Sequence, residues 1–262
     1  EVLEQVPHHL VDILNISQSF SAQSFKTLAK QSAEEILSRK KLPILAGGTG
    51  LYIDMLIKDI ILPEIRNNPA LRAQLNSIAA EKGNLYLHEI LASCDPASAA
   101  AIHPNNVKRV VRAIEIFRMT QVTMSEWNKR SMQKESDFAP FKVYLTANRQ
   151  KLYDIIDARV DSFIQAGLED EVRGLYEKGL ASAPTASQAI GYKEFRQYIE
   201  GTASLDDTVA LIKQNTRNYA KRQETYFAKM DFDLTFDAAV SNTSGQCEQI
   251  CRAVNIQDTE GV

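Results

Sequence analysis

A pair of glycines behind a short apolar run is the first feature whose residue types could support chemistry. The apolar run is Ile44–Ala46, and it is followed directly by Gly47, Gly48 and Thr49. Glycine removes the side chain where a backbone turns tightly or another group approaches closely. Thr49 can cap a helix over Gly50–Ile57, and the amide donors at a helix N-terminus suit anions. The stretch predicts either an anion-binding turn or a plain connection between a strand and a helix.

Basic residues recur at helical spacing in two further segments. In the first, Lys108 and Arg112 lie one turn apart behind the predicted helix cap Asn106. Arg109 lies beside them. A helix start that carries Lys and Arg is suited to hold a phosphate backbone. A solvated basic helix in an ordinary bundle is the competing interpretation.

The second basic segment also carries aromatic residues. Lys213, Arg217 and Lys221 recur every fourth residue and line one face of a predicted helix. Tyr219 and Tyr226 lie among them. Cations hold phosphates while rings stack on exposed bases, so this pattern favours a nucleic acid with unpaired bases. The aromatic residues can instead belong to the core, which is the commoner fate of such side chains.

A third candidate lies in a predicted helix over Ser187–Glu200, where Gly191 and Tyr192 occupy the first turns. Glycine inside a helix costs about 1 kcal/mol relative to alanine. Its presence predicts either the close approach of a backbone or ligand, or tight packing between helices.

Alternating strands and helices are expected to position the glycine pair. Leu10–Ile16 is predicted as a strand, Ser21 as the cap of a helix that ends near Arg39, and Ile44–Ala46 as a second strand. This alternation predicts an α/β fold with a parallel sheet. Ligands bind at the carboxyl ends of such strands, which is where Gly47–Thr49 would lie.

The pattern becomes wholly helical from about residue 62. Residues 62–137 are predicted to form a helical insertion domain, and residues 1–61 and 138–262 the α/β core with C-terminal helices. In the insertion we expect helices from Asn68–Pro69 to Gly83, from Asn84 to Ser93, from Asp95–Pro96 to Pro104, from Val107 to Met119 and from Met124 to Met132. In the core we expect strands Phe141–Ala147 and Phe232–Asp237, and helices Arg149–Ile164, Leu168–Lys178, Leu205–Lys229 and Gly245–Val254.

The distribution of charge suits an anionic partner, although the formal net charge is −3. Residues 103–130 hold six Lys or Arg against two Glu, and residues 213–229 hold five against one. Such segregation can place a positive surface on an acidic protein, and it can also reflect solvated helix faces. The three cysteines form no C-x-x-C pair, which predicts a reducing, cytoplasmic compartment. No apolar run is long enough to predict a membrane span.

Five motifs follow one another along the chain. They are Pro7–Leu10, Ala46–Tyr52, Ile102–Asn105, Ala189–Lys193 and Thr216–Gln223. Their order and spacing resemble the tRNA dimethylallyltransferase (tRNA isopentenyltransferase) family over nearly the whole chain. Asn106 stands where that family usually has Asp, and either residue can cap a helix.

The resemblance implies a P-loop-NTPase-like parallel-sheet core with an inserted all-helical domain. It implies an enzyme that moves a dimethylallyl group from dimethylallyl diphosphate to N6 of the adenine next to the anticodon of tRNA, with Mg²⁺ neutralising the leaving diphosphate. We expect a monomer that binds the tRNA anticodon stem-loop and no membrane. By the same likeness Arg159 is a diphosphate-side arginine, and tRNA contacts fall on Thr49, Arg72, Lys108, Arg109, Arg112, Gln188, Gly191, Tyr192, Lys193, Arg217, Lys221, Arg222 and Gln223.

Two motifs of that family do not occur in these 262 residues. One is a glycine-rich phosphate loop ending in Gly-Lys-Ser/Thr, and the other is a catalytic Asp in an Asp-Ser-x-Gln segment. We expect both to lie ahead of Glu1, leave the catalytic base unassigned, and expect the 262-residue chain alone to be inactive. Thr49 is then predicted to contact the flipped adenine rather than the diphosphate. The alternatives are an adenylate isopentenyltransferase acting on free nucleotide, which would not need two basic helices, and a catalytically silent RNA-binding module.

Overall fold

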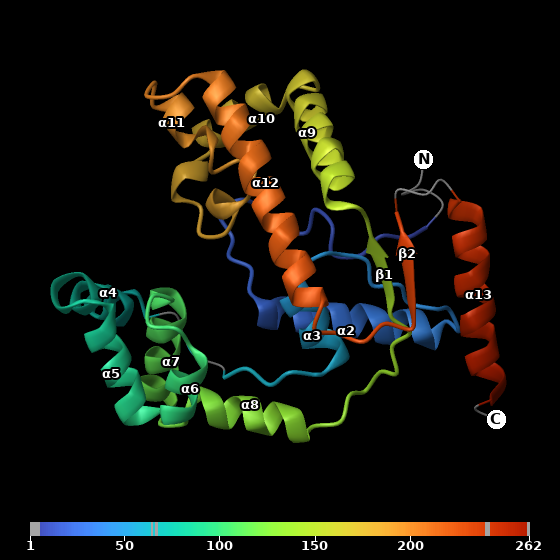
Figure 1. The fold of residues 1–262 in the computed structure, drawn as a ribbon, viewed down its shortest axis with the longest axis horizontal. Helices are drawn as coiled ribbons and strands as arrows, with labels where there is room; N and C mark the ends of the chain where they lie inside the picture. Colours follow the sequence, from blue (N-terminus) through green and yellow to red (C-terminus); the bar gives the residue numbers. More distant parts are fainter. Residues whose placement is uncertain (1–5, 64, 66–67, 239–241, 261–262) are drawn as a thin grey trace. The chain divides into compact units, whose positions relative to one another are not determined.

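The computed structural model describes residues 6–63, 65, 68–238 and 242–260 (Figure 1). The chain divides into two compact units. Unit 1 comprises Glu1–Gly50 and Ala139–Val262, and unit 2 comprises Leu51–Phe138. None of the helices in the described ranges is both long and apolar enough to cross a membrane.

A two-stranded parallel sheet lies in unit 1. β1 (Val143–Thr146) pairs with β2 (Leu234–Asp237), and the two arrows lie side by side in Figure 1. The backbone amide of Ala238 extends the pairing by donating to the Thr146 carbonyl at 2.7 Å. Parallel strands joined through helices make this an α/β fold, as the sequence predicted.

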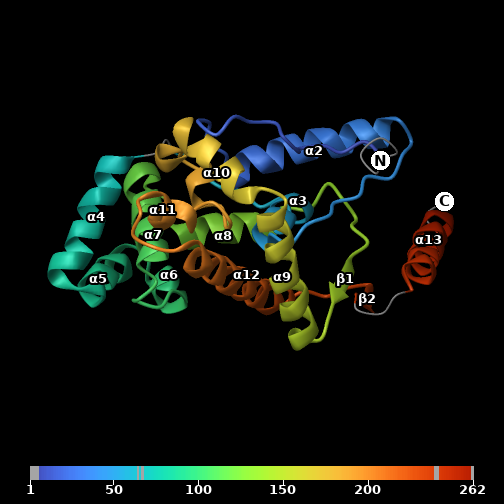
Figure 2. The same ribbon diagram turned by 90° about the horizontal axis from the view of Figure 1, so that it is seen from above.

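The other regular elements in the described part of unit 1 are helices. They are α2 (Ala22–Ser38), α9 (Arg149–Gln165), α10 (Leu168–Glu177), α11 (Phe195–Ile199), α12 (Leu205–Phe227), α13 (Thr243–Glu260) and the short 3₁₀ turns η1 (Leu180–Ser182) and η2 (Ala186–Gln188). α12 begins with a reciprocal cap in which Ser204 and Asp207 bond to each other's backbone amides. α9 lies against α12 (Figure 1; Figure 2). Their shared core surrounds the fully buried Phe195, with Val160, Val172 and Ile212 packed near it.

The described part of unit 2 is helical. Its helices are α3 (Gly50–Ile57), which starts at the boundary between the units, α4 (Pro69–Lys82), α5 (Asn84–Cys94), α6 (Pro96–Ala101), α7 (Val107–Thr120) and α8 (Met124–Gln133). The core consists of Leu75, Leu87, Leu91, Ala99, Val110, Val111, Ala113 and Ile114. The buried Asp95 accepts from the backbone amides of Ser98 at 3.1 Å and of Ser125 at 3.0 Å. One carboxylate thus stabilises the starts of two helices, α6 and α8.

The structure corrects three predicted elements. Leu10–Ile16 is not a strand, because Leu10 and Asp12 have φ values of 60° and 51°, outside the extended region. Ile44–Ala46 is not a strand either, and Ile44 is 81% exposed. The predicted helix over Ser187–Glu200 is instead η2, a turn and α11, because Gly191 has a φ of 96°.

Candidate nucleic-acid interface

The glycine turn of unit 1 packs against the C-terminal half of α12. The Thr49 hydroxyl oxygen lies 3.1 Å from that of Tyr219. A Cβ atom at Gly48 would overlap the Gln223 side chain, and one at Gly50 would overlap the Tyr226 ring. These two glycines therefore allow the turn to approach α12 closely, which places Thr49 beside Gln223, another predicted tRNA contact.

The basic stripe of α12 divides into two parts. Lys213 and Arg217 face α9, where Lys213 Nζ lies 2.6 Å from Asp161 Oδ1 and Arg217 Nη1 lies 2.6 Å from both carboxylate oxygens of Asp157. Arg149 of α9 similarly bonds Glu224 of α12 at 3.0 Å. Lys213 and Arg217 thus tie α12 to α9, a structural role that the sequence pattern did not predict.

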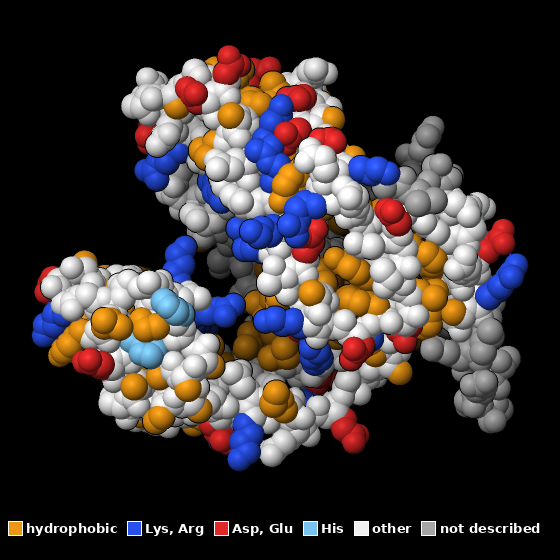
Figure 3. Space-filling model, viewed as in Figure 1, with side chains coloured by type: hydrophobic (Ala, Val, Ile, Leu, Met, Phe, Trp, Pro, Cys, Tyr) orange, Lys and Arg blue, Asp and Glu red, His pale blue; other side chains and the backbone are white. Residues whose placement is uncertain are grey.

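The other part of the stripe is available to a partner. Lys221 and Arg222 are exposed, and neither forms an ion pair within the described ranges. The Arg222 guanidinium lies 5.5 Å from the centroid of the Tyr219 ring, a cation–π arrangement. Figure 3 shows Lys and Arg side chains gathered over α12 on the face that it draws. A cation pair beside an aromatic ring suits a nucleic acid, because it combines phosphate binding with a surface for stacking.

A buried glutamate organises the turn that contains Gly191. Glu194 Oε2 accepts from the Gly191 amide at 2.9 Å, and its Oε1 accepts from Asn215 of α12 at 2.7 Å. Lys193 Nζ lies 3.6 Å from the same carboxylate. The predicted contacts Gly191 and Lys193 are therefore joined to α12 through Glu194. Glu194 was not among the residues predicted from the sequence, although an acidic residue directly after Lys193 and before the apolar Phe195 was a usable signal.

Tyr192 points to a different partner. Its hydroxyl donates to Glu171 Oε1 at 2.5 Å. That hydrogen bond, together with burial, raises the pKa of Tyr192 to about 12. Tyr192 is therefore a protonated hydrogen-bond donor at neutral pH.

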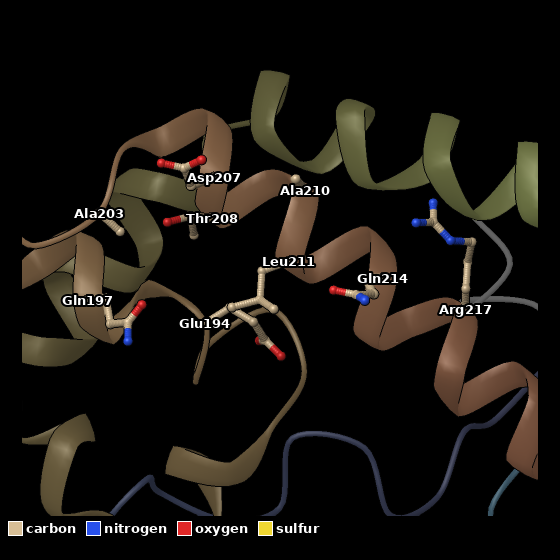
Figure 4. A pocket seen from close by; sticks show the side chains of 9 residues that line it. All are labelled: Glu194, Gln197, Ala203, Asp207, Thr208, Ala210, Leu211, Gln214 and Arg217. Atoms are coloured by element: carbon tan, nitrogen blue, oxygen red, sulfur yellow. The ribbon is translucent and has the colours of Figure 1, made fainter.

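Two hollows lie near these residues. Gln188 and Lys193 line a small one of about 150 Å³ together with Arg196 and Tyr176. A larger one of about 460 Å³ follows one face of α12, as Figure 4 shows, and is lined by Glu194, Gln197, Ala203, Asp207, Thr208, Ala210, Leu211, Gln214 and Arg217. The charged groups of the larger hollow already have partners, namely Asn215 for Glu194, Ser204 for Asp207 and Asp157 for Arg217. The small hollow is the one that joins predicted contacts.

In unit 2, two predicted tRNA contacts meet at one carboxylate. Arg72 of α4 bonds both oxygens of Glu115, at 2.8 Å from Nε and 3.1 Å from Nη2. Arg112 of α7 bonds Glu115 Oε2 at 2.7 Å from Nη1. Lys108 and Arg109 are exposed at the start of α7. Asn106 occupies the cap position as predicted, but its side chain makes no capping bond.

The family follows from comparison with known proteins. A family model described as IPP transferase matches residues 1–230. The chain belongs to the IPP transferase family. A tRNA dimethylallyltransferase of Geobacillus thermodenitrificans is 46% identical over 237 residues, which cover 89% of this chain and 75% of that relative. A tRNA dimethylallyltransferase of Bacillus subtilis is 43% identical, with the same coverage of both chains.

Solved structures agree with this IPP transferase assignment. A full-length tRNA isopentenylpyrophosphate transferase from Bacillus halodurans gives a TM-score of 0.69 at 37% identity and covers 98% of this chain and 80% of its own. A eukaryotic dimethylallyltransferase acting on tRNA gives a TM-score of 0.77 at 26% identity and covers 97% of this chain and 67% of its own. The α/β fold with helices in both units is therefore that of a known tRNA-modifying family.

Two further predictions from the sequence concern a diphosphate and a metal ion. Arg159 is exposed on α9, and its guanidinium lies 5.1 Å from the centroid of the Phe163 ring. A diphosphate role for Arg159 stays a prediction. Within the described ranges no three His, Cys, Asp or Glu side chains gather as metal ligands. This finding does not test the expected Mg²⁺, because Mg²⁺ is usually bound through one or two carboxylates together with substrate phosphates.

Proposed function

We propose that the chain acts in a tRNA dimethylallyltransferase, which transfers the dimethylallyl group of dimethylallyl diphosphate to N6 of the adenine next to the anticodon. The observation that supports this most directly is the 46% identity to a tRNA dimethylallyltransferase over 237 residues. The exposed Lys221 and Arg222 beside Tyr219 add a surface whose chemistry suits an RNA loop.

The reaction makes a nitrogen–carbon bond and breaks a carbon–oxygen bond. The N6 nitrogen of adenine bonds to C1 of the dimethylallyl group, and the diphosphate leaves with the electron pair of the broken bond. N6 loses one proton to a base. We assign that base to no residue of this chain. A requirement for Mg²⁺ stays a prediction, and no step is derived through the metal.

The contacts within unit 1 support the following proposed roles for its residues. The target adenine leaves its stack to react. Thr49, held at Tyr219, forms a wall against which that base is placed. Lys221 and Arg222 bind phosphates of the anticodon loop, and Arg159 lies toward the diphosphate. Each assignment is a proposal that single substitutions can test.

Free adenylate is the competing acceptor, and a silent RNA-binding module is the competing role. Half-exposed or exposed cations in both units favour a polyanionic acceptor over a single nucleotide. The direct experiment is deletion of the encoding gene, followed by mass spectrometry of tRNA nucleosides. We expect N6-dimethylallyladenosine to disappear from tRNA and to return when the gene is restored. An unchanged nucleoside profile would contradict the proposal.

A second experiment separates the acceptors in vitro. A fluorescent anticodon stem-loop should bind the chain, as measured by anisotropy, and unlabelled tRNA should displace it whereas a large excess of AMP should not. Displacement by AMP at similar concentration would favour the nucleotide enzyme. Light scattering of the same sample should give the mass of a monomer, alone and with one stem-loop bound.

A further inference from the structure

Glu115 is an unusual residue to find in the core of unit 2. It lies on α7 between Ile114 and Ile116, and its side chain is 0% exposed. A carboxylate in such a place is costly unless cations and hydrogen bonds compensate for the lost water. Burial raises the pKa of Glu115, but the hydrogen bonds and charges of Arg72 and Arg112 outweigh it and hold the pKa below the usual range. The carboxylate is therefore ionised at neutral pH.

The two arginines reach Glu115 from outside the core. The Arg72 and Arg112 side chains are 42% and 36% exposed, so each contacts the buried carboxylate and also faces solvent. Arg72 uses its Nε–Nη2 edge on Glu115, which leaves its Nη1–Nη2 edge unused by this carboxylate. Arg112 uses Nη1 alone, which leaves its Nε–Nη2 edge. Both edges that Glu115 leaves unused match the spacing of two phosphate oxygens.

A purely structural tie between α4 and α7 does not explain this arrangement. Buried ion pairs are often no more stable than apolar residues of the same size, so stability alone is a weak reason to keep one. A single arginine would also balance the carboxylate. With two, the cluster of Arg72, Glu115 and Arg112 carries a net positive charge, and the exposed Lys108 lies one turn before Arg112 on the same helix.

We propose that Glu115 is a positioning residue, which holds Arg72 and Arg112 as a preorganised pair of guanidinium groups that binds the phosphate backbone of the RNA substrate. Free arginine side chains lose rotamer entropy when they bind a phosphate. A carboxylate that fixes both guanidinium planes beforehand removes part of that loss. The inference rests on the proposed function, since it presupposes that the chain binds tRNA.

The decisive variant is Glu115→Gln, because positioning and simple charge predict opposite results. Removal of one negative charge near a phosphate should by itself strengthen RNA binding. If Glu115 positions the arginines, the affinity should instead fall by about tenfold, the scale of one charge-assisted hydrogen bond. The slope of log K against log salt should also become shallower, because fewer cations contact phosphate. The probe is a fluorescent anticodon stem-loop titrated at several salt concentrations.

The matched control is Glu126→Gln in the same unit. Glu126 pairs with Arg130 at 3.2 Å, and both side chains are nearly half exposed, so this change removes the same charge from a solvated pair. We expect unchanged or slightly tighter binding and an unchanged salt slope. Circular dichroism and a thermal melt show whether each variant is folded at the temperature of the titration.

A second variant keeps the test valid if Glu115→Gln does not fold. Arg72→Lys preserves the charge but loses the two-oxygen geometry, and it should weaken binding in the same way. Combined with Glu115→Gln, it should add little, because both changes remove one arrangement. If the unaltered chain binds the stem-loop and Glu115→Gln or Arg72→Lys binds it equally or more tightly, the positioning role is wrong. If the unaltered chain does not bind, the proposed function itself fails.

Discussion

The hydroxyl groups of Thr49 and Tyr219 lie 3.1 Å apart, although 170 residues separate them in the chain. This contact joins the turn that follows Ile44–Ala46 to the C-terminal half of α12. It brings a polar side chain, an aromatic ring and the Arg222 guanidinium into one neighbourhood. The glycines on either side of Thr49 are what permit so close an approach.

The Thr49–Tyr219 contact should be measurable as a coupling. Thr49→Val and Tyr219→Phe each remove one hydroxyl and keep the shape of the side chain. Because both groups are at the surface, we expect a coupling free energy of about 0.5–1.5 kcal/mol from a double-mutant cycle in urea unfolding. Losses that simply add would show that the two hydroxyls do not interact.

The three glycines of the turn should respond differently to a methyl group. Gly50→Ala meets the Tyr226 ring and should cost about 1–3 kcal/mol, as overpacking usually does. Gly48→Ala meets only the movable end of Gln223 and should cost less. Gly47→Ala is the control, because no atom lies within 4 Å of the added Cβ. Equal melting temperatures for Gly47→Ala and Gly50→Ala would contradict this packing of the turn on α12.

The basic residues of α12 should separate into two classes on substitution by glutamine. Lys221→Gln and Arg222→Gln should weaken stem-loop binding and reduce the salt slope by about one for each phosphate that no longer meets a cation. Lys213→Gln should lower stability slightly and leave the slope nearly unchanged, because Lys213 is paired with Asp161. A filter-binding titration in which Lys213→Gln behaves like Lys221→Gln would argue against this division.

The stability of unit 2 should fall in acid. Burial raises the pKa of Asp95, but the hydrogen bonds from Ser125 and Ser98 outweigh it and hold the pKa below the usual range. A depressed carboxyl pKa adds stability at pH values above about 4, the pKa of an unfolded Asp, and this stability is lost as the pH falls through the folded value. Asp95→Asn should cost about 1–3 kcal/mol at pH 7, since one amide donor loses its acceptor.

That prediction is checked by urea unfolding at a series of pH values. The free energy of unfolding should decrease less in acid for the Asp95→Asn variant than for the unaltered chain. Part of the decrease should remain in the variant, because the pKa of Glu115 is also depressed. The exposed Glu81→Gln serves as the comparison. If the unaltered chain and Asp95→Asn lose stability in parallel as the pH falls, then the pKa of Asp95 is the same in the folded and the unfolded state, and the prediction is wrong.

Capping residues predicted the ends of helices such as α4 well, because a capping signal involves only a few neighbouring residues of the chain. Asn68, Pro69 and Gly83 bound α4 as expected, with Asn68 accepting from the Leu71 amide. The predictions of strands at Leu10–Ile16 and Ile44–Ala46 were wrong, because an apolar run indicates only that its residues could be buried in a sheet. Whether a neighbouring strand lies beside them is not encoded in the run itself.

The site was predicted in part for a similar reason. Helical spacing identified the face of α12 that carries Lys213, Arg217 and Lys221, but spacing on one helix says nothing of what that face meets. Asp157 and Asp161 of α9 pair with two of these three cations, Arg217 and Lys213. Likewise Arg72 and Arg112 were expected as separate contacts, and the carboxylate that joins them is visible only once α4 packs on α7.

The ion pairs between α9 and α12 also set how far one helix can slide along the other. The pairs run in opposite directions along the two helices, from Arg149–Glu224 through Asp157–Arg217 to Asp161–Lys213. A change of register by one residue would break all three pairs together, because consecutive residues lie about 100° apart around a helix and the charged side chains would no longer face the other helix. The three pairs therefore fix the register of α12 against α9, and with it the position along α9 of the part of α12 that bears Lys221 and Arg222.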